Sequence, residues 1–322
     1  MQSITEAELT ARTRVLVRCD LDVPLKNGKP EETFRLDKSL PTLQYIQEKG
    51  AFPIICGHMG RPSGVYKEEL STKQLKPYFD EHLGANNYTL LENLRFDPGE
   101  DNNSLTYAKS LAVHAEVYVN ESFATSHRFS ASMVTLPEIL PPFAGLHLLK
   151  EVETAATLLK DPKRPLVVII GGAKLETKKP VINKFAKFAD AVLIGGKLAF
   201  DWNEEVTQNL KLPIDYAPGN KDIGPKTIEL FVNVVKSAST VLMVGPLGLY
   251  EDPKFITGTK RVIEAMAKSE CFSILGGGDT IAAADKIGYL DKMGFVSTGG
   301  GALLQFLVDG SLPALESLGY HG

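Results

Sequence analysis

Short apolar runs alternate along the chain with longer amphipathic segments. In the first half, the runs that predict strands are 15–17, 53–56, 88–91 and 117–119, and a helix is predicted near 40–49. In the second half, the predicted strands are 166–170, 191–194, 240–244, 272–275 and 294–296. This alternation is typical of parallel sheets that are covered by helices on both faces.

The length of the chain predicts more than one domain. At 322 residues it exceeds the size at which a single hydrophobic core stops growing. The segment 148–160 reads as an amphipathic helix that stops before Pro162, and we interpret it as the connector. The expected architecture is therefore α/β, with two doubly wound, parallel-sheet, Rossmann-like domains at 1–150 and 151–322 that are separated by a cleft.

Composition narrows the class of protein. The chain is 43% hydrophobic and 23% charged, as in ordinary globular proteins, and its formal net charge is -4. Because it has no basic block, we expect no nucleic-acid partner. The first residues contain no apolar signal core, and the longest apolar runs are too short to span a bilayer. We therefore expect a cytoplasmic protein without a membrane partner, and we expect a monomer.

Different residue types follow the strands in the two halves. Arginine and histidine follow the first set of strands, and glycine follows each strand of the second set. Ligands of open α/β sheets bind at the carboxyl ends of the strands. The sequence thus predicts a glycine-lined pocket with Lys174 and Lys178 near its mouth, and a cationic cluster of Arg35, His58, Arg61, Arg95 and Arg128.

Two glycine strings near the end of the chain predict a phosphate site. GGGDT (276–280) and STGGGA (297–302) each follow an apolar run and precede a predicted helix. Glycine lets an anion approach the bare N–H groups at a helix start, which carry partial positive charge. Asp279 is placed to hold a phosphate-bound Mg²⁺ through water, although it could also simply cap the helix. Two such turns in succession indicate a nucleotide.

Eight sequence blocks follow one another along the chain: VRCDLDVP (17–24), GHMGRP (57–62), LLENLRF (90–96), HR (127–128), GGAK (171–174), DIGPKT (222–227), GGGDT (276–280) and STGGGA (297–302). A single block such as GGAK is ordinary, but the ordered series covers nearly the whole chain and is specific. The series resembles the phosphoglycerate kinase family. That resemblance implies reversible phosphoryl transfer from 1,3-bisphosphoglycerate to Mg-ADP, giving 3-phosphoglycerate and Mg-ATP by closure of a hinge between the domains.

The resemblance also implies which residues form the sites. The first domain would bind 3-phosphoglycerate or 1,3-bisphosphoglycerate through Asp20, Asp22, Arg35, His58, Met59, Gly60, Arg61, Arg95 and Arg128. The second would bind ADP or ATP through Lys178, Gly196, Glu251, Gly277, Gly278, Asp279 and Thr280, with Glu251 at the ribose and Asp279 as the Mg²⁺ ligand. The catalytic positions would be Arg35, Lys174, Lys178, Gly278 and Gly300. The tail 305–322 would pack back on the first domain.

The chain also departs from the usual family pattern. It is shorter, chiefly between 71–87 and 200–220, and it carries Asp22 and Val244 where asparagine is usual and Lys197 where glycine is common. These departures keep an alternative open, namely an impaired, shortened binding protein that retains the anion and nucleotide sites. A dinucleotide-dependent dehydrogenase is disfavoured because no GxGxxG turn follows the first strand, and a P-loop enzyme because GxxxxGK[ST] is missing.

Overall fold

The computed structural model describes residues 1–322 and divides them into two compact units. The first unit comprises Met1–Thr154 and Asp309–Gly322, and the second comprises Ala155–Val308. Helix α5, Leu146–Lys160, begins in the first unit and ends in the second. The chain therefore passes between the units twice, once within α5 and once near residue 308.

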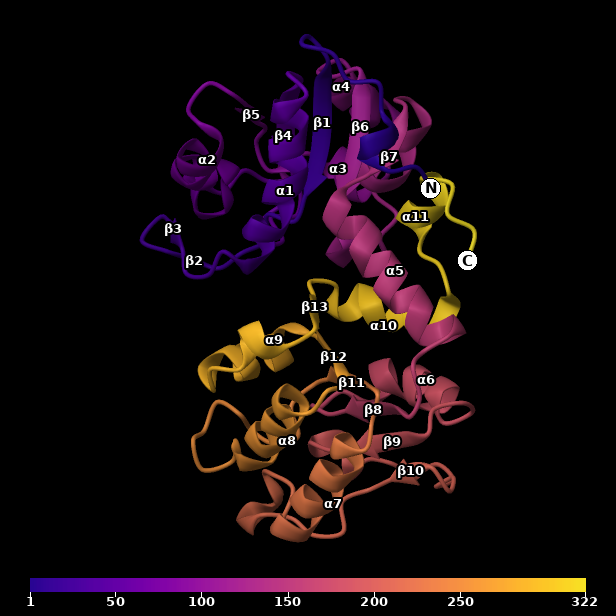
Figure 1. Cartoon of the computed structure of the whole chain (residues 1–322). Helices are drawn as coiled ribbons and strands as arrows, with labels where there is room; N and C mark the ends of the chain where they lie inside the picture. The colour runs from indigo at the N-terminus through magenta and orange to yellow at the C-terminus, as the bar shows by residue number, and fades with distance from the viewer. The chain divides into compact units, whose positions relative to one another are not determined.

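The first unit contains a five-stranded sheet in the order β5-β4-β1-β6-β7, and every pair is parallel (Figure 1). Its strands are β1 Arg14–Cys19, β4 Phe52–Cys56, β5 Thr89–Leu90, β6 Val117–Glu121 and β7 Pro142–Ala144. A separate antiparallel hairpin pairs β2 Leu25–Lys26 with β3 Lys29–Pro30. Because the chain moves outward from β1 in both directions, the sheet is doubly wound.

Both faces of this sheet are covered. Val15 and Val17 on one face pack with Leu36 and Leu43 of the neighbouring helix α1 in one buried core. Arg18 on the other face bonds to a π-helical turn, η6, which spans Ala131–Thr135. The helices of this unit, besides α5, are α1 Phe34–Glu48, α2 Lys76–Leu83, α3 Pro98–Asp101, α4 Leu105–Ala112 and α11 Pro313–Ser317.

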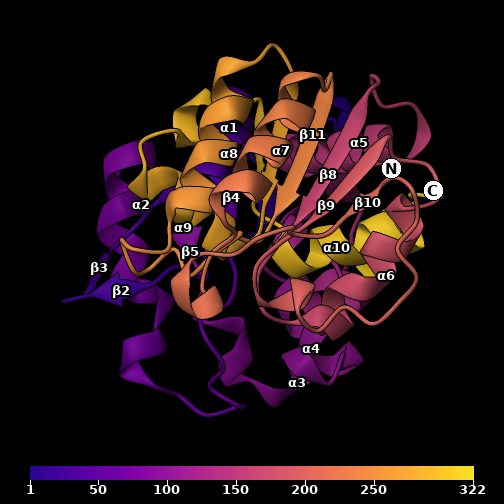
Figure 2. The same ribbon diagram turned by 90° about the horizontal axis from the view of Figure 1, so that it is seen from below.

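The second unit contains a six-stranded parallel sheet in the order β10-β9-β8-β11-β12-β13, and Figure 2 shows β9, β8 and β11 side by side. Its strands are β8 Leu166–Ile170, β9 Ala191–Ile194, β10 Leu210–Lys211, β11 Thr240–Val244, β12 Phe272–Gly276 and β13 Phe295–Ser297. Its helices are α6 Leu175–Phe185, α7 Pro225–Lys236, α8 Thr257–Lys268, α9 Gly278–Lys286 and α10 Gly300–Asp309. The winding direction reverses between β8 and β11.

Short 3-10 turns join many of these elements. They are η1 Ile4–Glu6, η2 Glu68–Leu70, η3 Thr72–Leu75, η4 Leu94–Phe96, η5 Phe123–Thr125, η7 Leu136–Glu138, η8 Lys197–Ala199, η9 Pro218–Asn220 and η10 Leu290–Lys292. None of the helices combines the length and the apolar character that a membrane crossing requires.

The α/β class and the two doubly wound parallel sheets are confirmed. The first helix, predicted near 40–49, instead begins at Phe34 and contains Pro41 in its interior. Proline is common in the first turn of a helix, so the sequence suggested a start that is too late. Strands β7 and β10 were missed because two or three residues carry no readable alternation.

The last residues of the chain belong to the first unit. Leu312 and Leu315 are buried, and the backbone N–H of Ala314 donates to the carbonyl of Ser126 at 3.1 Å. The amino group of Met1 donates to the carbonyl of Gly319 at 3.0 Å. The Ala314 bond attaches the tail to the loop that carries His127 and Arg128, and the Met1 bond attaches it to the start of the chain.

Candidate active site

In the first unit, the carboxyl ends of parallel strands bring the predicted residues together. Asp20 and Asp22 follow β1, and His58 to Arg61 follow β4. Arg95 lies in η4 after β5, and Arg128 follows β6. Arg35 differs from the others because it lies in the first turn of α1 and not in a strand-end loop.

Arg35 is held by the loop after β1. One of its Nη atoms lies 3.3 Å from Oδ2 of Asp20 and donates to the carbonyl of Asp22 at 3.3 Å. Burial raises the pKa of Asp20, although Arg35 and Arg18 oppose this shift. The Arg35 side chain remains 30% exposed, so its guanidinium is oriented and still accessible to a ligand.

His58 is almost completely buried, and its ring is fixed on both sides. Nη2 of Arg18 lies 2.9 Å from Nδ1, and Oδ2 of Asp22 lies 3.7 Å from Nε2. Since arginine only donates, Nδ1 must accept and the ring proton resides on Nε2. Burial lowers the pKa of His58 well below its usual value, and Arg18, Arg95, Arg128 and Arg35 lower it further. His58 is therefore a neutral donor.

Arg18 was not predicted as a site residue, although an arginine inside a buried apolar strand was a readable signal. Its side chain is 2% exposed and donates through Nε to the Ser132 hydroxyl at 3.1 Å. Ser132 donates in turn to the buried carboxylate of Glu100, through its hydroxyl at 2.6 Å and its backbone N–H at 3.0 Å. This network fixes the guanidinium that orients His58.

Three further arginines line a cavity of about 460 Å³ in the same unit: Arg61, Arg95 and Arg128. Arg95 is 7% exposed, donates to the carbonyl of Gly60 at 2.9 Å and pairs with Asp101 at 3.1 Å. Gly60 has φ +60°, and a Cβ there would lie 2.7 Å from the Leu70 side chain. Met59 is buried, and its carbonyl accepts from the Asn93 side chain at 2.7 Å.

In the second unit, three glycine turns meet beside the β8–β11 reversal. The N–H of Gly172 donates to the carbonyl of Pro246 at 2.8 Å, and the N–H of Gly196 donates to the carbonyl of Leu247 at 3.0 Å. A Cβ on Gly196 would lie 2.5 Å from the backbone nitrogen of Gly172. Because any side chain there would separate these turns, glycine is required for their close approach.

The two predicted phosphate turns are neighbours. A Cβ on Gly300 would lie 3.7 Å from the Cα of Gly277, so the turns after β13 and β12 lie side by side. Gly277 has φ +89° and precedes α9, and no atom lies within 4 Å of a Cβ built on Gly278. The first N–H groups of a helix have no partner within that helix, and the space at Gly278 leaves room for an anion.

Two lysines lie on the turn and helix after β8. Lys174 is the N-cap residue of α6 and is exposed. Lys178, one turn into α6, donates to the carbonyl of Gly171, and a Cβ on Gly245 would lie 2.6 Å from its Nζ. Burial lowers the pKa of Lys178, and the nearby Asp279 opposes this shift.

The structure gives Thr280 a second role. Its hydroxyl accepts from the N–H of Gly245 at 2.6 Å, and its side chain is fully buried. This bond links the first turn of α9 to the turn after β11. This pairing could not be predicted from the sequence, because 35 positions separate the two residues.

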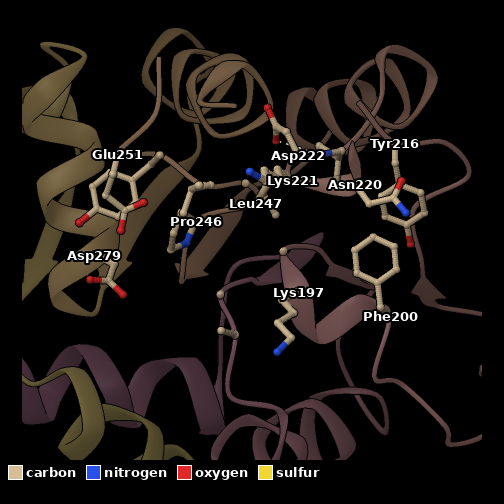
Figure 3. Close-up of a pocket in the computed structure, with 17 residues that line it drawn as sticks. Lys197, Phe200, Tyr216, Asn220, Lys221, Asp222, Pro246, Leu247, Glu251 and Asp279 are labelled. Atoms are coloured by element: carbon tan, nitrogen blue, oxygen red, sulfur yellow. Dashed lines mark hydrogen bonds between the residues drawn. The ribbon is translucent and has the colours of Figure 1, made fainter. Parts of the chain in front are cut away.

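A cavity of about 350 Å³ opens beside these turns (Figure 3). Glu251 and Asp279 lie at one end of it, and Phe200 and Tyr216 lie at the other. Gly196 and Lys197 also line the cavity, with Pro246 and Leu247 between its ends. Its size falls in the range of small-molecule sites.

The side chains of this cavity suit a metal ion that is bound mainly by the phosphates of a ligand and only partly by the protein. Nowhere in residues 1–322 do three or more His, Cys, Asp or Glu side chains cluster as a metal site. Mg²⁺ commonly takes one or two carboxylates and completes its shell with phosphate oxygens and water. The exposed carboxylate of Asp279, in the first turn of α9, meets that requirement.

Comparisons with known proteins agree with this geometry. A family model described as phosphoglycerate kinase matches residues 4–211 and 201–310. A phosphoglycerate kinase of Leptospira biflexa is 35% identical over 379 aligned positions, which cover 95% of each chain. One of Clostridium tetani is 34% identical and covers 98% of this chain and 97% of its own. An alignment of 379 positions exceeds the 322 residues of this chain, so the Leptospira relative carries internal segments missing here.

Solved structures show the same similarity. Phosphoglycerate kinase from Coxiella burnetii matches with a TM-score of 0.86 and 31% identity, covering 98% of both chains. The enzyme from Pyrococcus horikoshii OT3 matches with a TM-score of 0.85 and 27% identity, covering 99% of this chain and 98% of its own. Both the sequence and the fold are therefore shared over nearly their full length. The chain belongs to the phosphoglycerate kinase family of glycolytic phosphotransferases.

Proposed function

We propose that the chain transfers the acyl phosphate of 1,3-bisphosphoglycerate to Mg-ADP, giving 3-phosphoglycerate and Mg-ATP, and that the reaction is reversible. One observation supports this most directly. An arginine-lined site in one unit and a glycine-turn site in the other have the complementary chemistry that a carboxyl-phosphate donor and a nucleotide acceptor require.

The first unit would bind the glycerate substrate. Arginine donates two parallel hydrogen bonds to a carboxylate or phosphate, so Arg61, Arg95 and Arg128 suit the charged groups of the substrate. The Nε2–H of His58 would donate to a substrate oxygen. Asp20 and Asp22 would orient Arg35 and His58 and accept from the single hydroxyl of the substrate.

The second unit would bind the nucleotide. The N–H groups beside Gly277, Gly278 and Gly300 would contact phosphate oxygens, and Glu251 would accept from the ribose hydroxyls. Asp279 would hold Mg²⁺, which supplies charge compensation to the phosphates when it is bound. Lys178 would add a positive charge beside the same turns.

The reaction requires no general base. The attacking phosphate oxygen of ADP is already an anion, and the departing carboxylate is a weak base. The requirement is charge compensation on the oxygens of the moving phosphoryl group, which Arg35 and Lys174 would supply from the two units. Transfer therefore requires the units to close around both substrates, which would also exclude water.

A coupled assay with the purified chain tests this proposal. ATP formation from 1,3-bisphosphoglycerate and Mg-ADP is expected, and it should be lost without Mg²⁺. Separate calorimetric titrations with 3-phosphoglycerate and Mg-ADP measure the two sites individually. Binding of both ligands without transfer would contradict the proposed reaction and support the alternative of an impaired binding protein.

A further inference from the structure

The three arginines that line the cavity of the first unit have different surroundings. Arg61 and Arg128 are exposed, and neither side chain forms a hydrogen bond or an ion pair within residues 1–322. Arg95 is buried, and its Nε donates to Oδ1 of Asp101 at 3.1 Å. Asp101 is the single acidic residue among those that line this cavity. One arginine of the site is therefore already paired with a carboxylate of the protein itself.

Arg95 does not depend on Asp101 for its position. Its side chain is buried, and its Nη1 donates to the carbonyl of Gly60 at 2.9 Å. Burial lowers the pKa of Arg95, Asp101 raises it, and the neighbouring Arg128 and Arg18 lower it again. The chief effect of Asp101 is therefore electrostatic, because its negative charge offsets the repulsion between these arginines.

The position of Asp101 conflicts with the binding of a substrate anion at Arg95. A guanidinium binds a carboxylate or a phosphate most strongly through two parallel N–H donors along one edge. Asp101 occupies the Nε end of such an edge. Its side chain is 52% exposed, and it is the last residue of the short helix α3, so it can turn into the solvent without disturbing the core. A ligand anion can therefore take its place.

We propose that Asp101 is an internal anion that competes for Arg95, lowers the affinity of the arginine-lined cavity and is displaced when the acidic substrate binds. Arg61 and Arg128, which have no partner in the protein, would make the first contacts with the ligand. The competition would prevent tight retention of anions and so favour release of the product. This inference rests on the proposed function of the first unit.

Calorimetric titration of the full chain with two probes tests the inference. 3-Phosphoglycerate is the proposed product, and inorganic phosphate is a simple anion without a glycerate group. Asp101→Asn keeps the shape of the side chain and removes its charge, so both Kd values should fall by about 3- to 10-fold, the scale of a partly exposed charge pair. The gain should shrink at high salt, because counterions screen the charge. Asp101→Glu keeps the charge and should keep the original Kd values.

Glu116→Gln is the matched control, because it also removes one negative charge from a half-exposed pair with an arginine, Arg14. That pair lies at the amino ends of β1 and β6, at the opposite edge of the sheet, so the control should change neither Kd. Unchanged or weaker phosphate binding by Asp101→Asn would overturn the inference, as would weaker binding of 3-phosphoglycerate. Failure of the unsubstituted chain to bind 3-phosphoglycerate would overturn the proposed function, whereas tighter phosphate binding by Asp101→Asn would still support the competition at Arg95.

Discussion

His58 illustrates how single residues in the first unit are tuned by their neighbours. Its Nδ1 faces the buried guanidinium of Arg18 at 2.9 Å, and burial, together with four arginines, lowers its pKa well below the ordinary value of 6.5. A neutral ring donates one hydrogen bond without adding charge to a site that is already cationic. The Ser132–Glu100 network fixes Arg18 and so maintains this state.

The low pKa of His58 makes stability depend on pH. Below pH 6.5 the unfolded chain takes up a proton on this ring that the folded chain does not take up, so the free energy of unfolding falls as the pH falls. The expected contribution is about 1.4 kcal/mol per pH unit until the folded ring also protonates. Denaturant unfolding of the unsubstituted chain and of His58→Gln between pH 5 and about 8 measures it. Identical pH slopes in the two proteins would contradict this account.

Arg35 is the residue at which we expect a substitution to affect catalysis most directly. Arg35→Ala removes a charge that would act on the moving phosphoryl group, so kcat should fall by about 10²- to 10³-fold while the Kd for Mg-ADP is unchanged. Steady-state kinetics of the coupled reaction provide the measurement. Arg261→Ala, which changes an arginine on α8 that is 59% exposed, is the control. A nearly normal kcat with weaker glycerate binding would reduce Arg35 to a binding residue.

Sequence reasoning located residues whose chemistry follows a strand directly, such as His58 and Asp279. It could not locate partners that only the folded chain brings close. Arg18 and Ser132 are 114 positions apart, and the Phe200–Tyr216 stack lies in a segment without a motif. Lys197 was noted as unusual, and the structure places it on the wall of the cavity.

Among the secondary-structure elements, the start of α5 is attached to the sheet by one buried carboxylate. Glu121, the last residue of β6, accepts from the backbone N–H of His147 and of Leu148, both at 3.0 Å. It also accepts from the Thr42 hydroxyl at 2.6 Å. A Cβ on Gly145 would lie 2.0 Å from its Oε2, so glycine is required before the helix. A carboxylate at a helix N-terminus also interacts favourably with the helix dipole.

Glu121→Gln tests this attachment. The amide can accept from only one side, so a buried N–H of α5 loses its acceptor and faces a second donor. The free energy of unfolding should fall by about 1–3 kcal/mol in urea titrations. Glu116→Gln, which weakens an exposed pair with Arg14, should cost less than about 1 kcal/mol. Equal effects of the two substitutions would contradict the role assigned to Glu121.

Elements that bury a full apolar run were predictable from the sequence, as β8 and β11 show. Helix α1 was placed too late because Pro41 lies in its interior, where tertiary packing of Leu36, Leu43 and Ile46 outweighs the cost of the missing hydrogen bond. Strands β7 and β10 depend on pairing with β6 and β9 and have little signal of their own.

On the scale of the whole molecule, the first unit is not one continuous stretch of chain, whereas the second unit is. Residues 309–322 complete the first unit after the entire second unit has intervened. Leu312, Leu315 and Leu318 are each 5% exposed or less. The side chains proposed to bind the nucleotide lie wholly within Ala155–Val308. A change in the tail should therefore affect the site in the first unit and leave nucleotide binding by the second unit unchanged.

Truncation of the chain before Leu312 tests whether the two sites are independent. Turnover should be lost, because the first unit loses buried leucines, while the Kd for Mg-ADP should stay within about twofold. The milder Leu315→Ala should destabilise the first unit by about 2–5 kcal/mol, and Leu315→Met should cost less. Calorimetric unfolding together with Mg-ADP titration measures both effects. Equal losses of turnover and of Mg-ADP affinity would contradict the independence of the units.

The late completion of the first unit has a consequence for synthesis. A ribosome that has reached Val308 has made every residue of the second unit, but the nascent first unit still lacks the segment that covers part of its core. Domains near the N-terminus generally fold first during translation. In this chain the first unit can complete its fold only after the second unit has been synthesised. Until the last leucines emerge, part of the apolar surface of the first unit stays accessible to chaperones.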